Sequence, residues 1–265
     1  MISSQAYIHP GAIIGKNVRI DPFAAIHADV SIGDDTHIMS NVVIMEGTTI
    51  GKACQIFPGA VLGAIPQDLK FIGEKTTVEI GDNTTIREFV TINRGTQDKW
   101  KTVVGNDCLL MAYAHVAHDC ILGDHVILAN SVQLAGHVEI GDYAILGGMA
   151  GAPQFTRIGA HTYIAGHTVI RKDVPPFIKA GRMPLSYVGV NSVGMQRRGF
   201  GSQTINEILE IYRNIYNKKL NITQALEYIE GNLPATKEKD EIVSFIRESK
   251  KGIIKVFNKD EVHED

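Results

Sequence analysis

The sequence is poor in several features that would assign it to a special class of protein. Tryptophan occurs once in 265 residues, aromatic residues make up 7%, and no apolar run approaches the roughly 20 residues of a membrane-spanning helix. The 26 basic and 29 acidic side chains nearly cancel, which leaves a net charge of −3. This balance gives no electrostatic reason to expect binding to nucleic acid or to a membrane surface. With 44% hydrophobic and 21% charged residues, the composition is typical of a folded soluble protein.

Cysteine is scarce as well, since Cys54, Cys108 and Cys120 are the only three. We interpret them as buried packing thiols rather than as disulfides or catalytic thiolates, and their odd number favours a reducing compartment. The first residues also lack a basic segment followed by an apolar one, which is the pattern of a secretory leader. These features predict a cytoplasmic protein.

Aliphatic residues, in contrast, recur with a period of six. Steps of six from Ile8 to Ile170 give 28 positions, and Ile, Leu or Val occupies 24 of them. The residue four places after each of these positions is usually small or β-branched, and all three cysteines fall in this second column. Neither a helix, with period 3.6, nor a strand, with period 2, produces a period of six. Repeats of six residues predict a β-helix, a coil of short strands with a turn in each repeat.

Three such repeats make one turn of a triangular coil, so residues 18 apart are expected to stack in neighbouring turns, about 4.8 Å apart. The aliphatic residues then face the interior. Glycine and polar residues occupy the corners, where Gly, and to a lesser degree Asn or Asp, adopts left-handed backbone. The predicted fold is therefore a β solenoid, a parallel β-helix in the form of a triangular prism. Proteins that share this hexapeptide repeat wind left-handed, against the usual crossover rule, and we expect the same hand here.

The repeat is interrupted twice. Between Leu62 and Ile80 it lapses for one coil's length and then resumes in phase, which predicts a projecting loop near residues 64–77. A second, shorter lapse covers residues 95–102 and contains Trp100. Loops on rigid scaffolds commonly carry binding residues, so both are candidates for part of a functional site.

The chain is expected to divide into two domains. The run Asp173-Val174-Pro175-Pro176 should end the coil, because consecutive prolines cannot donate to a strand ladder. Residues 1–188 are then the left-handed β-helix, and residues 189–265 form a C-terminal α-helical domain.

Three helices are predicted in the second domain from apolar spacing and cap residues. The first begins after residue 200, where Thr204 and Glu207 resemble a capping box. The second runs from about 221 to 232, and the third from about 238 to 250.

Histidines form the densest group of chemically active side chains, at His115, His118, His125 and His137. A histidine at a solenoid corner is often simply solvated. A metal site needs three converging ligands, and some prism-shaped enzymes hold zinc between subunits through three histidines. A general base needs a reachable imidazole, an orienting carboxylate and an oxyanion donor.

The 18-residue spacing favours the general base. Gly136 lies 18 positions after His118, and Gln154 lies 18 positions further on. Asp119 and His137 are related in the same way and form the adjacent column. The backbone N–H of Gly136 would lie one turn above the imidazole, roughly 5 Å away. Such a pair suits attack of a hydroxyl on a carbonyl, since the base takes the proton and the N–H receives the oxyanion.

Several motifs together closely resemble the acyl-carrier-protein-dependent UDP-N-acetylglucosamine O-acyltransferases, which open lipid A biosynthesis. The resemblance covers essentially the whole chain. It rests on the following segments: Gln67-Asp68-Leu69-Lys70, Ala114-His115-Val116-Ala117-His118-Asp119-Cys120, Leu134-Ala135-Gly136-His137, Asp173-Val174-Pro175-Pro176, Asn191 and Arg197-Arg198-Gly199-Phe200.

This resemblance implies transfer of an (R)-3-hydroxyacyl chain from acyl carrier protein to the glucosamine 3-hydroxyl of UDP-N-acetylglucosamine. His118 would be the general base, Asp119 its orienting partner, and Gly136 the oxyanion donor. The resemblance also implies a homotrimer with active sites between neighbouring prisms. No metal and no organic cofactor is expected.

The resemblance further implies a set of substrate-binding residues. Asp68 and His137 would contact the sugar, Lys70 the acyl or pantetheine arm, and Asn191 and Arg197 the nucleotide. The full set is Gln67, Asp68, Lys70, His115, His137, Gln154, Gly166, Asn191, Arg197 and Arg198.

Two positions depart from the family pattern and a third bears on the acyl chain. Pro153 and Val193 replace a histidine and a glutamate that are typical of the family. These changes alter what can contact the acyl donor or sugar and the uridine, respectively. Gly166 falls where the family sets the floor of the acyl groove, and a glycine there leaves room for a longer chain.

Other classes of function stay open at this point. A sugar-nucleotide N-acyltransferase of the same repeat class would normally carry an additional N-terminal domain, whereas the coil here begins by Ile8. A zinc-dependent enzyme of the carbonic anhydrase type would bind stoichiometric zinc. A non-catalytic scaffold would be insensitive to replacement of His118.

Overall fold

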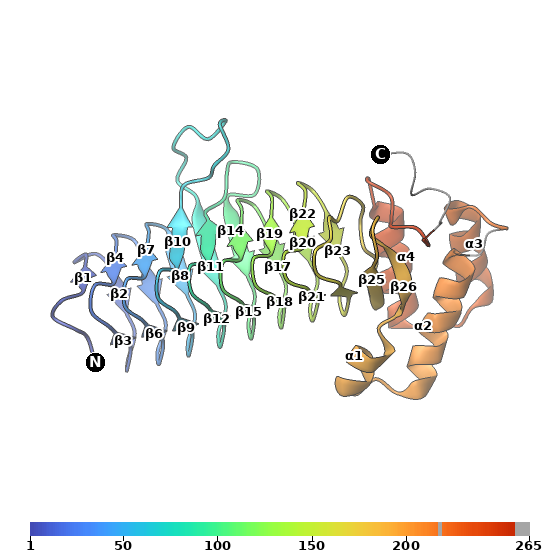
Figure 1. Cartoon of the computed structure of the whole chain (residues 1–265), viewed down its shortest axis with the longest axis horizontal. Coiled ribbons are helices and arrows are strands. Elements are labelled where there is room, and N and C mark those ends of the chain that lie inside the picture. Colours follow the sequence, from blue (N-terminus) through green and yellow to red (C-terminus); the bar gives the residue numbers. More distant parts are fainter. Residues whose placement is uncertain (217–218, 258–265) are drawn as a thin grey trace.

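The computed structural model describes residues 1–216 and 219–257 and consists of a long prism with helices at one end. In Figure 1 the N-terminal strands lie at the left tip of the prism, and the helices cover its C-terminal end. Among the described helices, none has the length and apolar character that a membrane span requires.

The prism has three faces, each a sheet of mostly two-residue strands. The first sheet contains β1 Tyr7–Ile8, β4 Ala25–Ile26, β7 Val43–Ile44, β10 Val61–Ala64, β13 Thr91–Asn93, β16 His115–Val116, β19 Gln133–Leu134 and β22 Gly151–Ala152. The second contains β2 Ile13–Ile14, β5 Ser31–Ile32, β8 Thr48–Ile50, β11 Thr77–Ile80, β14 Lys101–Val104, β17 Ile121–Leu122, β20 Glu139–Ile140 and β23 Arg157–Ile158. The third contains β3 Arg19–Ile20, β6 His37–Ile38, β9 Gln55–Ile56, β12 Thr85–Ile86, β15 Leu109–Leu110, β18 Ile127–Leu128, β21 Ile145–Leu146, β24 Tyr163–Ile164, β25 Ile178–Gly181 and β26 Ser186–Val190.

The aliphatic column fills the interior, as predicted. Every aliphatic residue of the six-residue series from Ile20 to Ile170 is buried, whereas Ile8 and Ile14 at the open end are only half-buried. The three cysteines are free and buried among them, and burial raises the pKa of each thiol. Inert packing thiols were predicted, and these features agree with that interpretation.

Strand register follows the predicted stacking. His115 of β16 pairs with Gln133 of β19, 18 positions later, and this spacing holds in most neighbouring turns. It is broken where Val61 pairs with Thr91 and where Thr91 pairs with His115. The two loops therefore add 12 and six residues to regular turns. The first is shorter than the full coil expected, and both are multiples of six, which is why the repeat stays in phase.

The chain turns at three corners, which we name by the sheets they join. The first corner joins the first sheet to the second and includes Asp119 and His137. The second corner joins the second sheet to the third and includes His161, and the third corner joins the third sheet to the first and includes Tyr113. The residues at these turns have positive φ, near 60° at Asp119 and His137.

Both loops project from the first corner. Residues 65–76 connect β10 to β11, and residues 94–100 connect β13 to β14. They also contact each other, since the Arg94 guanidinium lies over the ring of Phe71, 5.6 Å from its centroid. The scaffold thus concentrates its irregular segments along one edge.

The prolines do not end the coil, contrary to the prediction. After Pro175 and Pro176 the chain forms one more parallel strand, β25, which pairs with β24. The prolines fall in the turn before β25, where the strand ladder does not need their missing N–H groups. The last strand, β26, is antiparallel to β25 and closes the sheet.

Four helices follow in the described residues: α1 Ser192–Arg197, α2 Ser202–Ile215, α3 Ile222–Asn232 and α4 Lys237–Glu248. The short α1 was not predicted. Thr204 and Glu207 are not the cap of α2, because the helix begins earlier and its N-cap, Gly201, has no side chain to accept a hydrogen bond. The predicted limits of α3 are confirmed, and Asn221 with Gln224 forms its capping box.

Candidate active site

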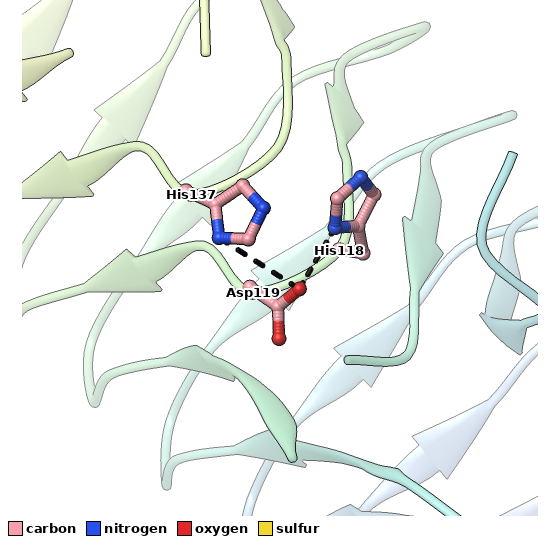
Figure 2. Close-up of side chains that lie close together, drawn as sticks. All are labelled: His118, Asp119 and His137. Carbon is pink, nitrogen blue, oxygen red and sulfur yellow. Dashed lines mark hydrogen bonds and ion pairs between the residues drawn. The ribbon is translucent and has the colours of Figure 1, made fainter. Parts of the chain in front are cut away.

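The first corner brings together His118, Asp119 and His137, as Figure 2 shows. His118 Nδ1 lies 2.8 Å from Asp119 Oδ2, and the two side chains are 5% and 0% exposed. Because an ionised carboxylate can only accept, Nδ1 is the donor and Nε2 is left with the free lone pair. This is the arrangement of a general base and its orienting carboxylate.

His118 lies directly beneath Gly136, as the spacing predicted. His137 N–H donates to His118 C=O at 3.0 Å, which fixes the two turns in register. A methyl group at Gly136 would lie 2.6 Å from His118 Nε2, so the glycine makes room for the imidazole. Among the described residues, no acceptor faces the Gly136 N–H, whereas the N–H groups of Ala135 and His137 on either side are bonded. The N–H of Gly136 is thus available to a substrate oxygen.

The Asp119 carboxylate is anionic although it is buried. Burial raises its pKa, but hydrogen bonds from Thr96, His118 and Lys99 outweigh burial and hold the pKa below its ordinary value. An anion at this place keeps the Nδ1 proton on His118 and leaves Nε2 basic.

His137 closes the other side of the cluster. Its ring stacks on Phe155 at 4.4 Å and meets the His118 ring edge-on at 4.9 Å. Its Nδ1 lies 3.0 Å from Asp98 Oδ2, yet the nitrogen has no partner of hydrogen-bonding geometry. We regard this as a close polar contact, not a hydrogen bond, because the direction of the N–H fails although the distance is short.

The same three side chains have the composition of a metal site, with ligand atoms within 4.8 Å of one another. His115 lies outside this group, and its Nδ1 is 2.7 Å from Thr91 Oγ1. Both oxygens of Asp119 already accept two hydrogen bonds each from protein donors. A metal ion would have to displace these donors, so the geometry fits a base and its partner better than a ligand set.

Comparisons with known proteins agree with this geometry. Residues 173–254 match the family model described as UDP-N-acetylglucosamine O-acyltransferase, domain 2, and residues 29–64 and 101–136 match the bacterial transferase hexapeptide model. A UDP-N-acetylglucosamine acyltransferase from Bacteroides fragilis is 51% identical, with a TM-score of 0.94 over 96% of this chain and 100% of its own. The corresponding structure from Acinetobacter baumannii is 41% identical, with a TM-score of 0.93 over 96% and 99% of the two chains.

The chain belongs to the UDP-N-acetylglucosamine O-acyltransferase family. Its coil is the left-handed parallel β-helix of these structures, as predicted. A curated relative, the acyl-(acyl-carrier-protein)–UDP-N-acetylglucosamine O-acyltransferase of Burkholderia mallei, is 42% identical over 163 residues. That match covers 60% of this chain and 62% of the relative, so the chain spans less than two thirds of the length of the curated relatives it matches.

Residues predicted to contact the acceptor from the loop lie at the same corner as His118. Gln67, Asp68 and Lys70 belong to the segment 65–76, where Gln67 and Lys70 are exposed and Asp68 is half-buried. Asp68 Oδ1 accepts the N–H of Lys70 at 3.0 Å, which makes a tight turn within the loop. None of the three contacts His118 directly within the described chain.

Gln154 is the third member of the His118 column, and the C-terminal segment holds it. Lys251 Nζ donates to the C=O of Gln154 and, at 3.2 Å, to Thr156 Oγ1. Pro153, which departs from the family pattern, uses its C=O to accept the hydroxyl of Thr156 at 2.7 Å.

Residues predicted to bind the nucleotide lie at the second corner instead. Asn191 is 6% exposed and caps α1, and its amide donates to His161 C=O at 2.9 Å. Arg198 donates to Tyr143 C=O at 3.0 Å. Arg197 is exposed, and no side-chain partner for it is found in the described part of the chain.

Gly166 occupies the third corner, between β24 and the segment that continues the first sheet. The predicted site of one chain is thus distributed over all three corners. His118, Gln154 and the loop share the first corner, but the nucleotide residues and Gly166 do not.

The sequence analysis identified the second lapse of the repeat as a candidate for part of a functional site, but not the individual residues of the loop 94–100 that enclose the cluster. Thr96, Asp98 and Lys99 contact Asp119, His137 and Glu139, respectively. The available signal was the second lapse of the repeat, because its position in the coil places it at the corner of His118.

Proposed function

We propose that the protein transfers an (R)-3-hydroxyacyl chain from acyl carrier protein to the 3-hydroxyl of UDP-N-acetylglucosamine, the first step of lipid A biosynthesis. The names of its relatives describe transfer of an acyl group from acyl carrier protein to an oxygen of UDP-N-acetylglucosamine, which supports the proposal. The reaction needs a base and an oxyanion donor, and it requires neither a metal ion nor an organic cofactor beyond the acyl carrier itself.

The chemistry follows from the two free atoms at the first corner. His118 Nε2 takes the proton of the sugar hydroxyl while the hydroxyl oxygen attacks the thioester carbonyl. The carbonyl oxygen becomes an anion that accepts the Gly136 N–H. The C–S bond then breaks, His118 returns the proton to the thiolate, and the products are the sugar ester and the free carrier thiol.

The observation that carries this proposal is the stacking of a buried His118–Asp119 pair directly beneath the unpaired Gly136 N–H. Four hydrogen bonds offset the desolvation of the Asp119 carboxylate, and one of them comes from His118 Nδ1. The pair thus leaves His118 Nε2 free beside the Gly136 N–H, which is what the acyl transfer needs.

The distribution of the predicted residues supports a homotrimer. Four turns of the third corner carry exposed apolar side chains, namely Phe23 at 61%, Phe89 at 52%, Tyr113 at 59% and Met149 at 58%. Phe89 and Tyr113 lie in successive turns and stack at 5.2 Å, and contiguous exposed apolar patches mark interaction surfaces. If three prisms meet with their third corners around one axis, the third sheet of one prism faces the first sheet of the next.

This arrangement completes the site. The second corner of one copy, with Asn191, Arg197 and Arg198, comes beside the first corner of its neighbour, with His118 and Asp68. Arg197 is then the guanidinium that meets the diphosphate, and Arg198 is the adjacent support.

The same arrangement gives the acyl chain a path. It would run from His118 inward between the two sheets, past the half-buried Ile127 and Ile145 on the outer side of the third sheet. Gly166, at the third corner, lies at the inner end of this path. Within one chain a methyl group at Gly166 would lie 2.8 Å from the C=O of Gly148. We expect this smallest residue at the inner end of the path to admit a long acyl group, and His115 and His137 lie on the facing copy.

The test is an assay with UDP-N-acetylglucosamine and (R)-3-hydroxyacyl carrier proteins of several chain lengths, with the products identified by mass spectrometry. We expect an ester on the glucosamine 3-hydroxyl, and a turnover at least ~100-fold lower in His118→Ala, the usual share of a general base. His27→Ala, a half-buried histidine in the second coil, serves as the control and should keep full activity.

Other outcomes identify the alternatives. Acylation only of a 3-amino sugar nucleotide would indicate an N-acyltransferase. Stoichiometric zinc together with hydration of carbon dioxide would indicate an enzyme of the carbonic anhydrase type. Full activity of His118→Ala would remove that residue from catalysis.

A further inference from the structure

The loop 94–100 forms a binding site for the carboxylate of Asp119. Of the four donors to this carboxylate, three come from the loop: Thr96 N–H to Oδ1 at 2.9 Å, Lys99 N–H to Oδ1 at 3.2 Å, and Thr96 O–H to Oδ2 at 2.6 Å. The fourth is His118 Nδ1, which also bonds Oδ2. A buried carboxylate stays ionised only when such donors replace its lost hydration.

The direction of the Thr96 hydroxyl proton is fixed by its neighbours. Thr96 Oγ1 accepts the N–H of Asp98 at 3.3 Å, and because the ionised Asp119 can only accept, the hydroxyl donates its proton to Asp119 Oδ2. Thr96 itself is 8% exposed, which keeps water from competing for this proton. The threonine hydroxyl is therefore a committed donor to the oxygen that holds His118.

The state of Asp119 decides which nitrogen of His118 carries the proton. An ionised Asp119 accepts from Nδ1 and leaves Nε2 free to act as a base. A protonated Asp119 would instead donate to Nδ1 and move the ring proton to Nε2, where it blocks proton abstraction. Any loss of donors to Oδ2 favours the second state, because burial alone raises the pKa of Asp119.

We propose that Thr96 is a positioning residue of the acyl transfer, whose hydroxyl keeps Asp119 ionised and thereby holds His118 in the Nδ1–H tautomer. Thr96 does not touch the substrate. The expected effect of Thr96 on turnover rests on the proposed function. Its expected effect on the tautomer of His118 does not, because that tautomer is a property of the free protein.

The test compares Thr96→Val, which replaces the hydroxyl by a methyl group of similar size, with Thr96→Ser, which retains the hydroxyl. We expect kcat of Thr96→Val to fall about 10- to 100-fold with little change in KM for UDP-N-acetylglucosamine, and Thr96→Ser to restore most of it. Thr162→Val is the matched control, since the buried Thr162 Oγ1 has no hydrogen-bond partner to lose.

The second measurement is independent of activity. Nitrogen-15 chemical shifts of labelled histidine distinguish the two tautomers, and the signal of His118 is identified by its absence in His118→Ala. We expect Nδ1–H in the unmodified protein and in Thr96→Ser, and a population of Nε2–H in Thr96→Val. Thr96→Ala against Thr96→Ser repeats the comparison with smaller side chains if valine disturbs folding.

The outcomes separate the two proposals. A Thr96→Val protein that keeps the Nδ1–H tautomer overturns the role of Thr96, whether or not its turnover changes. A tautomer shift in a protein without acyltransferase activity supports the role of Thr96 and contradicts the proposed function alone.

Discussion

His118 has space to act because position 136 carries no side chain. The imidazole lies against the backbone of Gly136, so the proposed base and the proposed oxyanion donor are neighbours without any intervening atom. Stacked turns of a solenoid hold such a pair at a constant separation, since each turn is bonded to the next. The proposed catalysis therefore needs the His118 imidazole, the Gly136 N–H group and the absence of a side chain at position 136.

The variant Gly136→Ala tests whether position 136 must lack a side chain. The new methyl carbon would lie 2.5 Å from His118 Cε1, closer than side chains approach, so the imidazole must turn away. We expect kcat to fall by roughly 100-fold, the share of a general base, while the fold persists. Gly231→Ala is the control, because a methyl group there meets nothing within 4 Å. Measured kcat equal to that of the unmodified protein would show that the two residues do not act together.

The residues of the regular coil could be predicted, and those of the loops could not. Counting in steps of 18 placed His118 beneath Gly136 and Gln154 above them, because the register of a solenoid is set by its period. Thr96 has no such relation to Asp119, which lies 23 positions further on across an insertion. Contacts of this kind depend on the path of the loop, which the sequence period does not encode.

Among the structural elements, the second corner joins the prism to the helical segment. His161 stacks on Tyr143 at 4.9 Å and on Phe177 at 5.4 Å, and Phe200, which follows α1, meets its edge at 5.0 Å. Arg198 completes the junction, with Nη1 3.4 Å from His161 Nδ1. The ring is therefore an acceptor beside a fixed cation, which requires it to be neutral.

His161 should make stability depend on pH. Burial, with Arg198 as a second cause, lowers the pKa of His161 to about 4, below its ordinary value of 6.5; Asp142 acts in the opposite direction and Lys237 adds to the lowering. Because the folded pKa is depressed, the neutral ring contributes fully above pH 6.5. As pH falls towards 4 the unfolded chain binds a proton that the folded chain does not, so stability is lost across this window.

The variant His161→Phe keeps the aromatic stack and removes the titration. Between pH 7 and pH 5 we expect the unmodified protein to lose about 1–2 kcal/mol more unfolding free energy than the variant, after allowance for partial solvent screening. Urea unfolding at both pH values and at one protein concentration measures the difference. Equal losses in the two proteins would contradict a depressed pKa at His161.

Aromatic corner residues explain why element boundaries were harder to predict than the repeat. Phe89, Tyr113 and Phe155 adopt positive φ, which sequence rules reserve for Gly, Asn and Asp. Stacking on the ring of a neighbouring turn offsets the free-energy cost of this backbone conformation, as between Phe89 and Tyr113 at 5.2 Å. The strand after Pro176 follows the same rule, because Phe177 turns with positive φ onto His161.

At the scale of the whole molecule, the residues proposed to form the site do not lie together in one chain. His118 lies at the first corner, whereas Asn191, Arg197 and Arg198 lie at the second. Contact between two different surfaces of identical chains is heterologous, and such contacts close into rings when the rotation allows. The exposed apolar third corner, around Phe89 and Tyr113, supplies the surface that three copies would share.

A mixture of two defective proteins tests whether the site is shared. His118→Ala removes the base from one corner, and Arg197→Ala removes a predicted phosphate ligand from another, so each homotrimer should turn over poorly at low UDP-N-acetylglucosamine. Unfolding and refolding them together gives mixed trimers in which roughly a quarter of the sites join an intact His118 of one copy to an intact Arg197 of its neighbour. We therefore expect the mixture to exceed both parents, and a refolded sample of each parent alone controls for recovery. If both residues served the same site within one chain, no mixed site would be intact, and the activity of the mixture would only average those of its parents.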